Sequence, residues 1–378
     1  MGCPADEVLV ECRNGTLRAA ALAKGELIEL VTEPQHSPGA PGSIYVGRVL
    51  GRAPAMRAAF VDIGLARPAL LDVEGELPQE GAVVPVQVVE AAFGDKGARV
   101  SRRLAIEGRY AVLLPNGKGI AVSRRVAGAK QRRQLQDAAA GLKGPREGLI
   151  VRAASAGASG GSLAADIAGL RARWDQVRAA LAGATPPACL LDTSDGVARL
   201  LRRFIMEGVP RFTFDDRMLG QRARATAERL FGVTPDVEVE TDPDRQFDRH
   251  GIGDVLASLD ETVIRLPSGG RLAIEQTAAV TAIDVDTAEG TGLGADAALR
   301  VDLEAAAEVG RQLRLRDVGG VIVVDFVRLK DRAQRARVEA VLRRAVALDR
   351  IAVQLLGWTA AGLFEMIRPR GRAVGALE

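Results

Sequence analysis

The chain has 378 residues, 47% of them hydrophobic and 26% charged, a composition that supports a sizeable core and excludes a largely disordered protein. At about 100–200 residues per domain, this length predicts two to four domains. Lysine and arginine exceed aspartate and glutamate only by 51 to 48, so the total charge does not identify a nucleic-acid partner.

Cysteine and histidine usage excludes several kinds of site. Cys3, Cys12 and Cys189 are far apart and form no CxxC pair, so neither a disulfide framework nor a structural zinc site is expected. Two histidines are too few for a histidine-rich metal centre. No apolar run reaches the roughly 18 residues of a membrane helix, and the acidic start lacks a signal-peptide pattern. We therefore expect a cytoplasmic protein without membrane contact.

The first half of the chain predicts mainly strands. Short strands with glycines at their turns are expected between 7 and 31, before a Pro/Gly/Ser connector at 34–41. From residue 43, five short β segments separated by glycine, proline or acidic turns are typical of a small barrel such as the OB fold. Beyond residue 108, strands alternate with helices predicted at 130–142 and 163–181.

The last third has the clearest pattern. A hairpin and a buried strand are predicted up to residue 287, and a long helix from 302 to 314 follows. Asp302 precedes an Ala-rich stretch and is interpreted as the N-cap of that helix. Residues 319–327 predict a fully apolar strand and 331–349 a basic helix, with two strand-like segments closing the chain.

Two of these apolar strands end in a carboxylate. They are VTAIDVDT with Asp284 and VIVVDFV with Asp325, and a buried acid is costly unless it is paired or bound to a metal. Asp286 follows Asp284 by two residues, so both project from the same face of the strand. Mg²⁺ suits a site with one or two carboxylates, and Mn²⁺ is an alternative. Turn capping or pairing with a nearby arginine is an equally open explanation of these acids.

Basic residues gather at 102–103, 124–125 and 130–133 and at Arg368, Arg370 and Arg372. Most charge runs are solvated surface, but a phosphate backbone could pass along them.

Long segments of the chain resemble one known family. LPSGGRLAIEQTAAVTAIDVDT and LEAAAEVGRQLRLRDVGGVIVVDF closely resemble the nuclease core of the bacterial ribonuclease E/G family. GSIYVGRV and AAFVDIG resemble its S1 RNA-binding domain, GLIVRAASAGAS its 5′-end sensor, and FDRHGI the junction into its nuclease domain. The similarity follows the chain in order over nearly its whole length.

The resemblance implies a mixed α/β, multidomain architecture. A split RNase H-like subdomain would occupy 1–36 and 195–257, and the S1 (OB-fold) domain at 37–103 and the 5′ sensor at 104–194 would be inserted into it. A DNase I-like catalytic subdomain would follow at 258–378. The implied activity is hydrolysis of single-stranded RNA, leaving a 5′-phosphate on the downstream product.

The resemblance also implies roles in the nuclease core. Asp284 and Asp325 match the family's magnesium ligands, and Asp286 belongs to the same catalytic group. Asp286 and Asp302 stand where the family has asparagines. An extra charge at Asp286 should hold a cation more firmly and repel the phosphodiester, so Asp286→Asn is expected to speed cleavage.

Four positions match RNA-contacting residues of the family: Phe60 and Lys96 in the S1 region, and Val112 and Arg152 in the sensor. Leu70 replaces a second S1 aromatic, and Ala153 replaces a threonine hydroxyl. Phe60 could equally be a core residue. The family's zinc-link is missing, so a zinc-linked tetramer is not expected.

Two functions from different classes follow. One is a metal-dependent endoribonuclease with single-stranded RNA as its partner; the other is an RNA-binding relative that has lost efficient catalysis through its changed site residues. A plain nucleotide-binding α/β protein is disfavoured because no P-loop or GxGxxG follows a strand.

Overall fold

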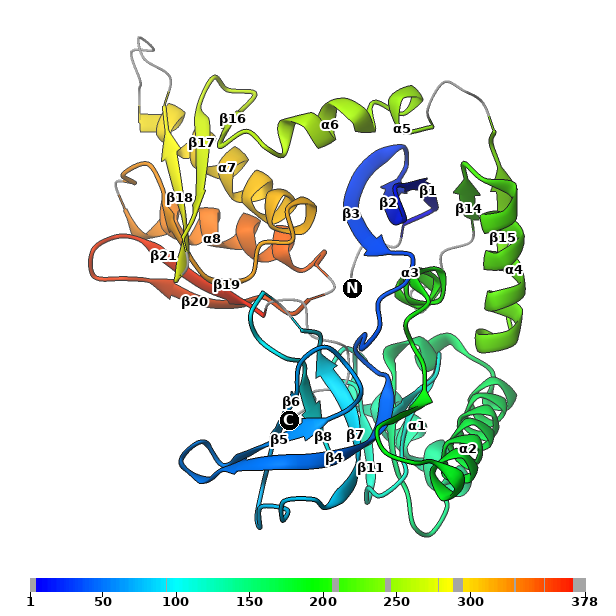
Figure 1. Cartoon of the computed structure of the whole chain (residues 1–378). Helices are drawn as coiled ribbons and strands as arrows, with labels where there is room; N and C mark the ends of the chain where they lie inside the picture. Colours follow the sequence, from blue (N-terminus) through cyan, green and yellow to red (C-terminus); the bar gives the residue numbers. More distant parts are fainter. Residues whose placement is uncertain are drawn as a thin grey trace.

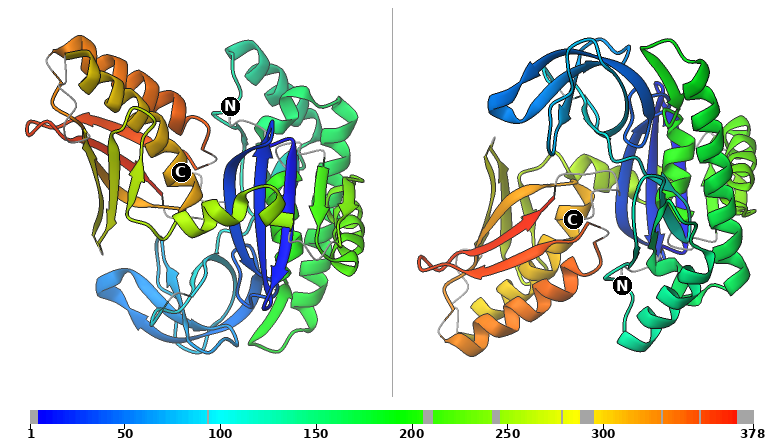
Figure 2. Two further views of the ribbon diagram at one scale, coloured as in Figure 1. Left: turned by 90° about the horizontal axis from the view of Figure 1, so that it is seen from above. Right: turned by 90° about the horizontal axis from the view of Figure 1, so that it is seen from below.

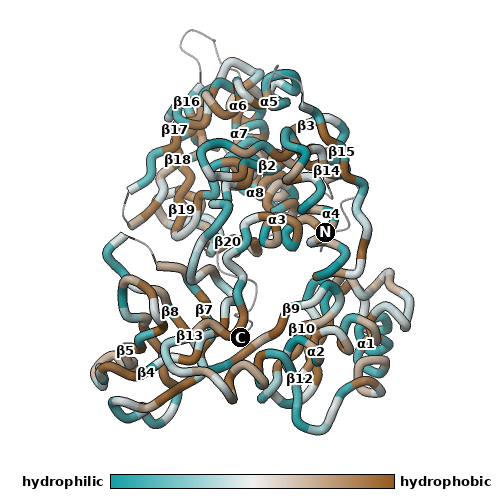
Figure 3. Tube along the Cα trace, turned by 45° about the vertical axis from the view of Figure 1, so that its right-hand side comes forward, coloured by the Kyte–Doolittle hydropathy of each residue, from teal (hydrophilic) through white to brown (hydrophobic). Residues whose placement is uncertain are grey.

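The structure, a computed structural model, describes residues 5–92, 94–205, 211–241, 246–277, 279–287, 295–329, 331–349 and 351–369. Four β-sheets with their helices make up this part of the chain, which confirms the predicted mixed α/β class (Figure 1). Hydrophobic stretches run along many of the strands, as the hydropathy colouring shows (Figure 3).

The N-terminal sheet combines two distant parts of the sequence. Its strand order is β15–β14–β1–β2–β3, and β14 runs parallel to β1. The strands are β1 (Glu7–Arg13), β2 (Thr16–Ala23), β3 (Glu26–Pro34), β14 (Arg211–Phe214) and β15 (Asp236–Val239). Helices α3 (Gly196–Ile205) and α4 (Arg217–Phe231) cover one face and share its core (Figure 2). Everything between residues 35 and 195 is therefore inserted between β3 and α3.

The first inserted unit is a closed barrel. Strands β4, β5, β6, β8 and β7 pair in that order, and β4 also pairs with β7, so the five strands form a ring. They are β4 (Ile44–Ala53), β5 (Ala58–Asp62), β6 (Ala69–Asp72), β7 (Val83–Glu90) and β8 (Arg99–Ser101). Outside the ring, β13 (Ala188–Leu191) adds to β4. The barrel lies where the short β segments predicted one.

The second inserted unit is a small sheet in the order β11–β12–β10–β9. Its strands are β9 (Ile106–Glu107), β10 (Ala111–Leu114), β11 (Ile120–Val122) and β12 (Gly148–Val151), and its helices are α1 (Ala129–Leu142) and α2 (Gly160–Gly183). Apolar residues of α2 pack on this sheet. Asp166 of α2 accepts hydrogen bonds from the backbone N–H groups of Tyr110 and Ala111 at 2.8 and 2.9 Å, which fixes the helix against β10.

The C-terminal sheet has the order β16–β17–β18–β19–β21–β20. Its strands are β16 (Val263–Arg265), β17 (Arg271–Gln276), β18 (Val280–Asp286), β19 (Gly320–Asp325), β20 (Gln354–Trp358) and β21 (Phe364–Arg368). Helices α7 (Ala295–Leu315) and α8 (Arg332–Val346) pack side by side on one face and leave the other open. Short helices α5 (Gln246–Arg249) and α6 (Ile252–Ser258) lead into this sheet (Figure 1).

Candidate active site

The two strand-end acids lie side by side on the open face of the C-terminal sheet. Strands β18 and β19 are parallel, and their register places Asp284 directly opposite Asp325. Burial alternates along β18, with Ile283 and Val285 packed in the core beneath the helices and Asp284 exposed between them. Buried strands with buried acids were expected here, but Asp284 and Asp325 are exposed, because helices cover only one face of the sheet. Because the two carboxyl groups are exposed, the cost of burying a charge does not by itself require a metal here. The reason to consider a metal is that the two acids lie next to each other.

Like-charge crowding shapes the electrostatics of this pair. Partial burial, together with the nearby Asp286 and Asp325, raises the pKa of the Asp284 carboxyl, while Arg271 acts in the opposite direction. A bound cation would relieve this repulsion, and carboxylate oxygens are the ligands that Mg²⁺ prefers. In the described part of the chain no group of three or more His, Cys, Asp or Glu side chains is arranged to hold a metal. The register that pairs Asp284 with Asp325 would fit a divalent ion held by two carboxylates and water.

Asp286 is engaged by an arginine that the sequence pattern did not single out. The Nε and Nη2 groups of Arg271 donate to Asp286 Oδ2 at 3.1 and 2.6 Å. The antiparallel register of β17 and β18 places these two residues directly opposite each other. The signal available in the sequence was the hairpin itself, because aligning its strands around the turn pairs residue 271 with 286. The expected extra negative charge beside Asp284 is therefore offset by a positive one.

Asp302 is not an N-cap. It lies inside α7, seven residues after the helix begins at Ala295, and it is fully buried. Its Oδ1 accepts a hydrogen bond from the Val327 N–H at 2.9 Å, so it ties α7 to the segment that follows Asp325. Oδ2 is buried and has no partner. Burial raises the pKa of Asp302 to about 7, and the nearby Asp325 carboxylate adds to the rise.

The two barrel residues that were predicted to contact RNA lie on the surface of the barrel. Phe60 on β5 has 42% of its area exposed, which excludes the core interpretation of this side chain. It lies opposite Leu70 of β6. Lys96, just after the turn at 94–95 and before β8, is also exposed. One aromatic face and one ammonium group are thus available on the barrel for a base and a phosphate.

In the small inserted sheet, Arg152 is already paired. Its Nη2 donates to Glu107 at 3.0 Å, and both side chains are mostly buried. Val112 is buried and lies opposite Glu107 in the β9–β10 register. Burial lowers the pKa of Arg202, whose charge interacts with those of Glu107 and Arg152. Glu107 could not be found from the sequence, because no local pattern connects it to a residue 45 positions away.

One member of the basic clusters is structural. Arg368 is buried, and it donates to Asp349 through Nε and to Asp317 through Nη1, both at 2.8 Å. Arg368 is therefore not a solvated surface charge, which was the default interpretation of the basic clusters. Arg370 and Arg372 lie outside the described residues. The clusters at 102–103 and 124–125 are exposed.

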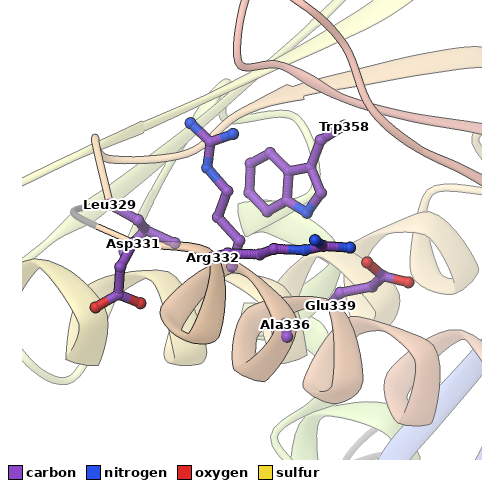
Figure 4. Close-up of a pocket in the computed structure, with 7 residues that line it drawn as sticks. Leu329, Asp331, Arg332, Ala336, Glu339 and Trp358 are labelled. Carbon is purple, nitrogen blue, oxygen red and sulfur yellow. The ribbon is translucent and has the colours of Figure 1, made fainter.

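A cavity of about 570 Å³ lies between Trp358 of β20 and residues of α8 and of the segment before it (Figure 4). Trp358 forms one wall, and its ring packs edge-on to Phe364, a core residue on the helix-covered side of the sheet. Arg335 places its guanidinium 5.2 Å from the centre of the same indole ring. Because Asp284 and Asp325 project from the opposite face, this cavity is not their substrate cleft.

The comparisons with known proteins give the family. The model of the Ribonuclease E/G family matches residues 105–371. Ribonuclease G of Escherichia coli K12 is 31% identical over 97% of this chain and 80% of its own length. Ribonuclease E of the same strain is 32% identical over 94% of this chain and 36% of its own length, and ribonuclease G of Haemophilus influenzae is 29% identical over 97% and 80%. Among the described residues, no helix is long and apolar enough to cross a membrane. The resemblance is confirmed: the chain belongs to the ribonuclease E/G family of endoribonucleases.

Proposed function

We propose that the protein is a metal-dependent endoribonuclease that cleaves single-stranded RNA in RNA processing and decay. The observation that carries this proposal is the register that sets Asp284 opposite Asp325 on an open sheet face. These two carboxylates would hold Mg²⁺ or Mn²⁺, with Asp286 completing the catalytic group. The bound ion would supply an activated water and neutralise charge on the phosphodiester during in-line attack.

Other residues of the chain would hold the RNA. Phe60 offers an exposed ring on which a base can stack, and Lys96 offers a charge for the backbone. We assign Arg152 and the neighbouring Val112 to recognition of the RNA 5′ end. We also propose a division of the chain into four units. They are an RNase H-like subdomain at 1–36 and 195–257, an S1 domain at 37–103, a 5′ sensor at 104–194 and a DNase I-like catalytic subdomain at 258–378.

The test is cleavage of a fluorescent single-stranded RNA by Asp284→Asn and Asp325→Asn variants. Both should lose cleavage by orders of magnitude and keep nearly full RNA binding in anisotropy measurements, because binding rests on the barrel and the basic surface. Glu275→Gln is the matched control: Glu275 lies on β17 opposite Ala282, exposed on the same open face. Unimpaired cleavage by either aspartate variant, or by the parent in EDTA, would contradict the site assignment.

A second candidate is an RNA-binding relative with weak catalysis. The buried and partly unsatisfied carboxylate of Asp302, placed behind Asp325, favours it because a negative charge there disturbs the charge balance of the acid pair. The same assay decides between the two. Binding without any metal-stimulated cleavage in the parent supports the second candidate.

A further inference from the structure

We propose that Arg271 is a positioning residue, which keeps Asp286 out of the metal-ligand set and so makes Asp284 and Asp325 a two-carboxylate site. This inference rests on the proposed function and deepens it. It concerns the ion pair between β17 and β18.

The geometry pairs Asp286 with Arg271 beside its neighbouring acids. Asp284 and Asp286 are two residues apart on one strand and share a face, so without a competitor both would face a cation bound there. Two nitrogens of Arg271 instead converge on a single oxygen of Asp286 at 2.6 and 3.1 Å. Hydrogen bonds between a guanidinium and a carboxylate are charge-assisted, and a divalent ion must displace both of them to recruit Oδ2 of Asp286.

The backbone holds Arg271 at this position. Gly270 precedes it, and a Cβ atom at residue 270 would lie 3.0 Å from the Asp286 carbonyl oxygen and 2.7 Å from Val301 Cγ1. The Gly270 carbonyl also accepts a hydrogen bond from the Leu266 N–H at 2.8 Å, which closes the turn between β16 and β17. A side chain at residue 270 would therefore force Val301 or the start of β17 to shift away from its place beside Asp286.

The pair matters for charge rather than for folding. Its side chains are 59% and 45% exposed, and ion pairs this exposed contribute little to stability. The acids Asp284, Asp286 and Asp325 carry a formal charge of −3, which Arg271 reduces to −2, the charge that one divalent cation balances. Without Arg271, the excess charge attracts the cation more strongly and repels the phosphodiester.

The experiment is a double-mutant cycle with two readouts. Parent, Arg271→Gln, Asp286→Asn and the double variant are compared for Mn²⁺ affinity of the RNA-free protein, followed by electron paramagnetic resonance of free Mn²⁺, and for kcat/KM on single-stranded RNA. Arg265→Gln is the matched control. Arg265 is exposed, carries the same charge and lies opposite Arg271 on β16, one strand farther from the acids.

Arg271→Gln should tighten Mn²⁺ binding about tenfold and lower kcat/KM about tenfold, because Asp286 becomes free to join the ligands. Asp286→Asn alone should weaken Mn²⁺ binding about tenfold. The double variant should return to within about threefold of the parent in both measurements, and Arg265→Gln should stay within about twofold. If the double variant is as impaired in cleavage as Arg271→Gln, then Arg271 acts on the RNA independently of Asp286 and the proposal is overturned. Unchanged Mn²⁺ affinity in Arg271→Gln overturns it as well.

Failure of the proposed function gives a different result. In that case Asp284→Asn retains both cleavage and Mn²⁺ binding, whatever the cycle shows. If Asp284→Asn loses both while the cycle shows no coupling, the metal site stands and only the role of Arg271 is refuted.

Discussion

Replacing Asp302 with asparagine should stabilise the C-terminal sheet, and more so as the pH rises. The carboxyl is fully buried, keeps one hydrogen bond to the Val327 N–H, and leaves Oδ2 without a partner. Asparagine retains an oxygen for that bond and carries no charge. Below the ordinary pKa both side chains are neutral, so the two proteins should then differ little.

The magnitude follows from the pKa. Burial raises the pKa of Asp302 from 3.8 to about 7, a difference of about three units. At roughly 1.36 kcal/mol per unit, ionising this group in the folded protein costs about 4 kcal/mol. Because the folded pKa lies above the unfolded one, the unfolded state releases its proton first. Stability therefore falls as the pH rises from about 4 to 7, and the full cost persists above pH 7.

The assay is urea unfolding followed by the fluorescence of Trp358, which packs on Phe364 of β21 and on Phe326, the residue after β19. A Trp174→Phe background removes the other tryptophan, and EDTA removes bound metal. The difference in free energy of unfolding between the asparagine variant and the parent should grow by about 2 to 3 kcal/mol between pH 5 and pH 8. A gap that stays constant over this range would refute the reasoning, since it would show that Asp302 does not ionise at a cost.

Three further predictions concern RNA contacts and the buried arginine. Phe60→Ala should weaken single-stranded RNA binding by about 1–3 kcal/mol without lowering the melting temperature, since the ring is exposed; anisotropy titration and thermal unfolding check this. The parent should show only a weak preference for 5′-monophosphate over 5′-hydroxyl RNA, because Glu107 already occupies Arg152, and Glu107→Gln should raise that preference about tenfold, the effect of one charge-assisted bond of ~1.5 kcal/mol. A strong monophosphate advantage in the parent would contradict this. Arg368→Ala should cost about 3–5 kcal/mol in urea unfolding, because it leaves the Asp349 carboxylate buried and unpaired, and Asp349→Asn alongside it should recover part of the loss.

The local sequence pattern was enough to predict several strands, the barrel and the family of this protein. Apolar runs that end in acids located β18 and β19 and picked out Asp284 and Asp325, since strand character depends on neighbouring residues. Short segments punctuated by glycine and proline predicted the barrel for the same reason. Long motifs identified the family, which the comparisons confirm. The start of α7 was placed seven residues too late, because Asp302 has the chemistry of a cap and the helix-forming residues before it were overlooked.

Tertiary structure decided which side chains meet. Helices on only one face of the C-terminal sheet leave Asp284 and Asp325 exposed, and periodicity within a strand does not reveal how many of its faces are covered. The pairs Arg271 with Asp286, Arg152 with Glu107 and Arg368 with Asp317 join residues 15, 45 and 51 positions apart. Each pairing depends on strand register and on the packing of separate elements, so a charge that looks free in the sequence can be neutralised or buried in the fold.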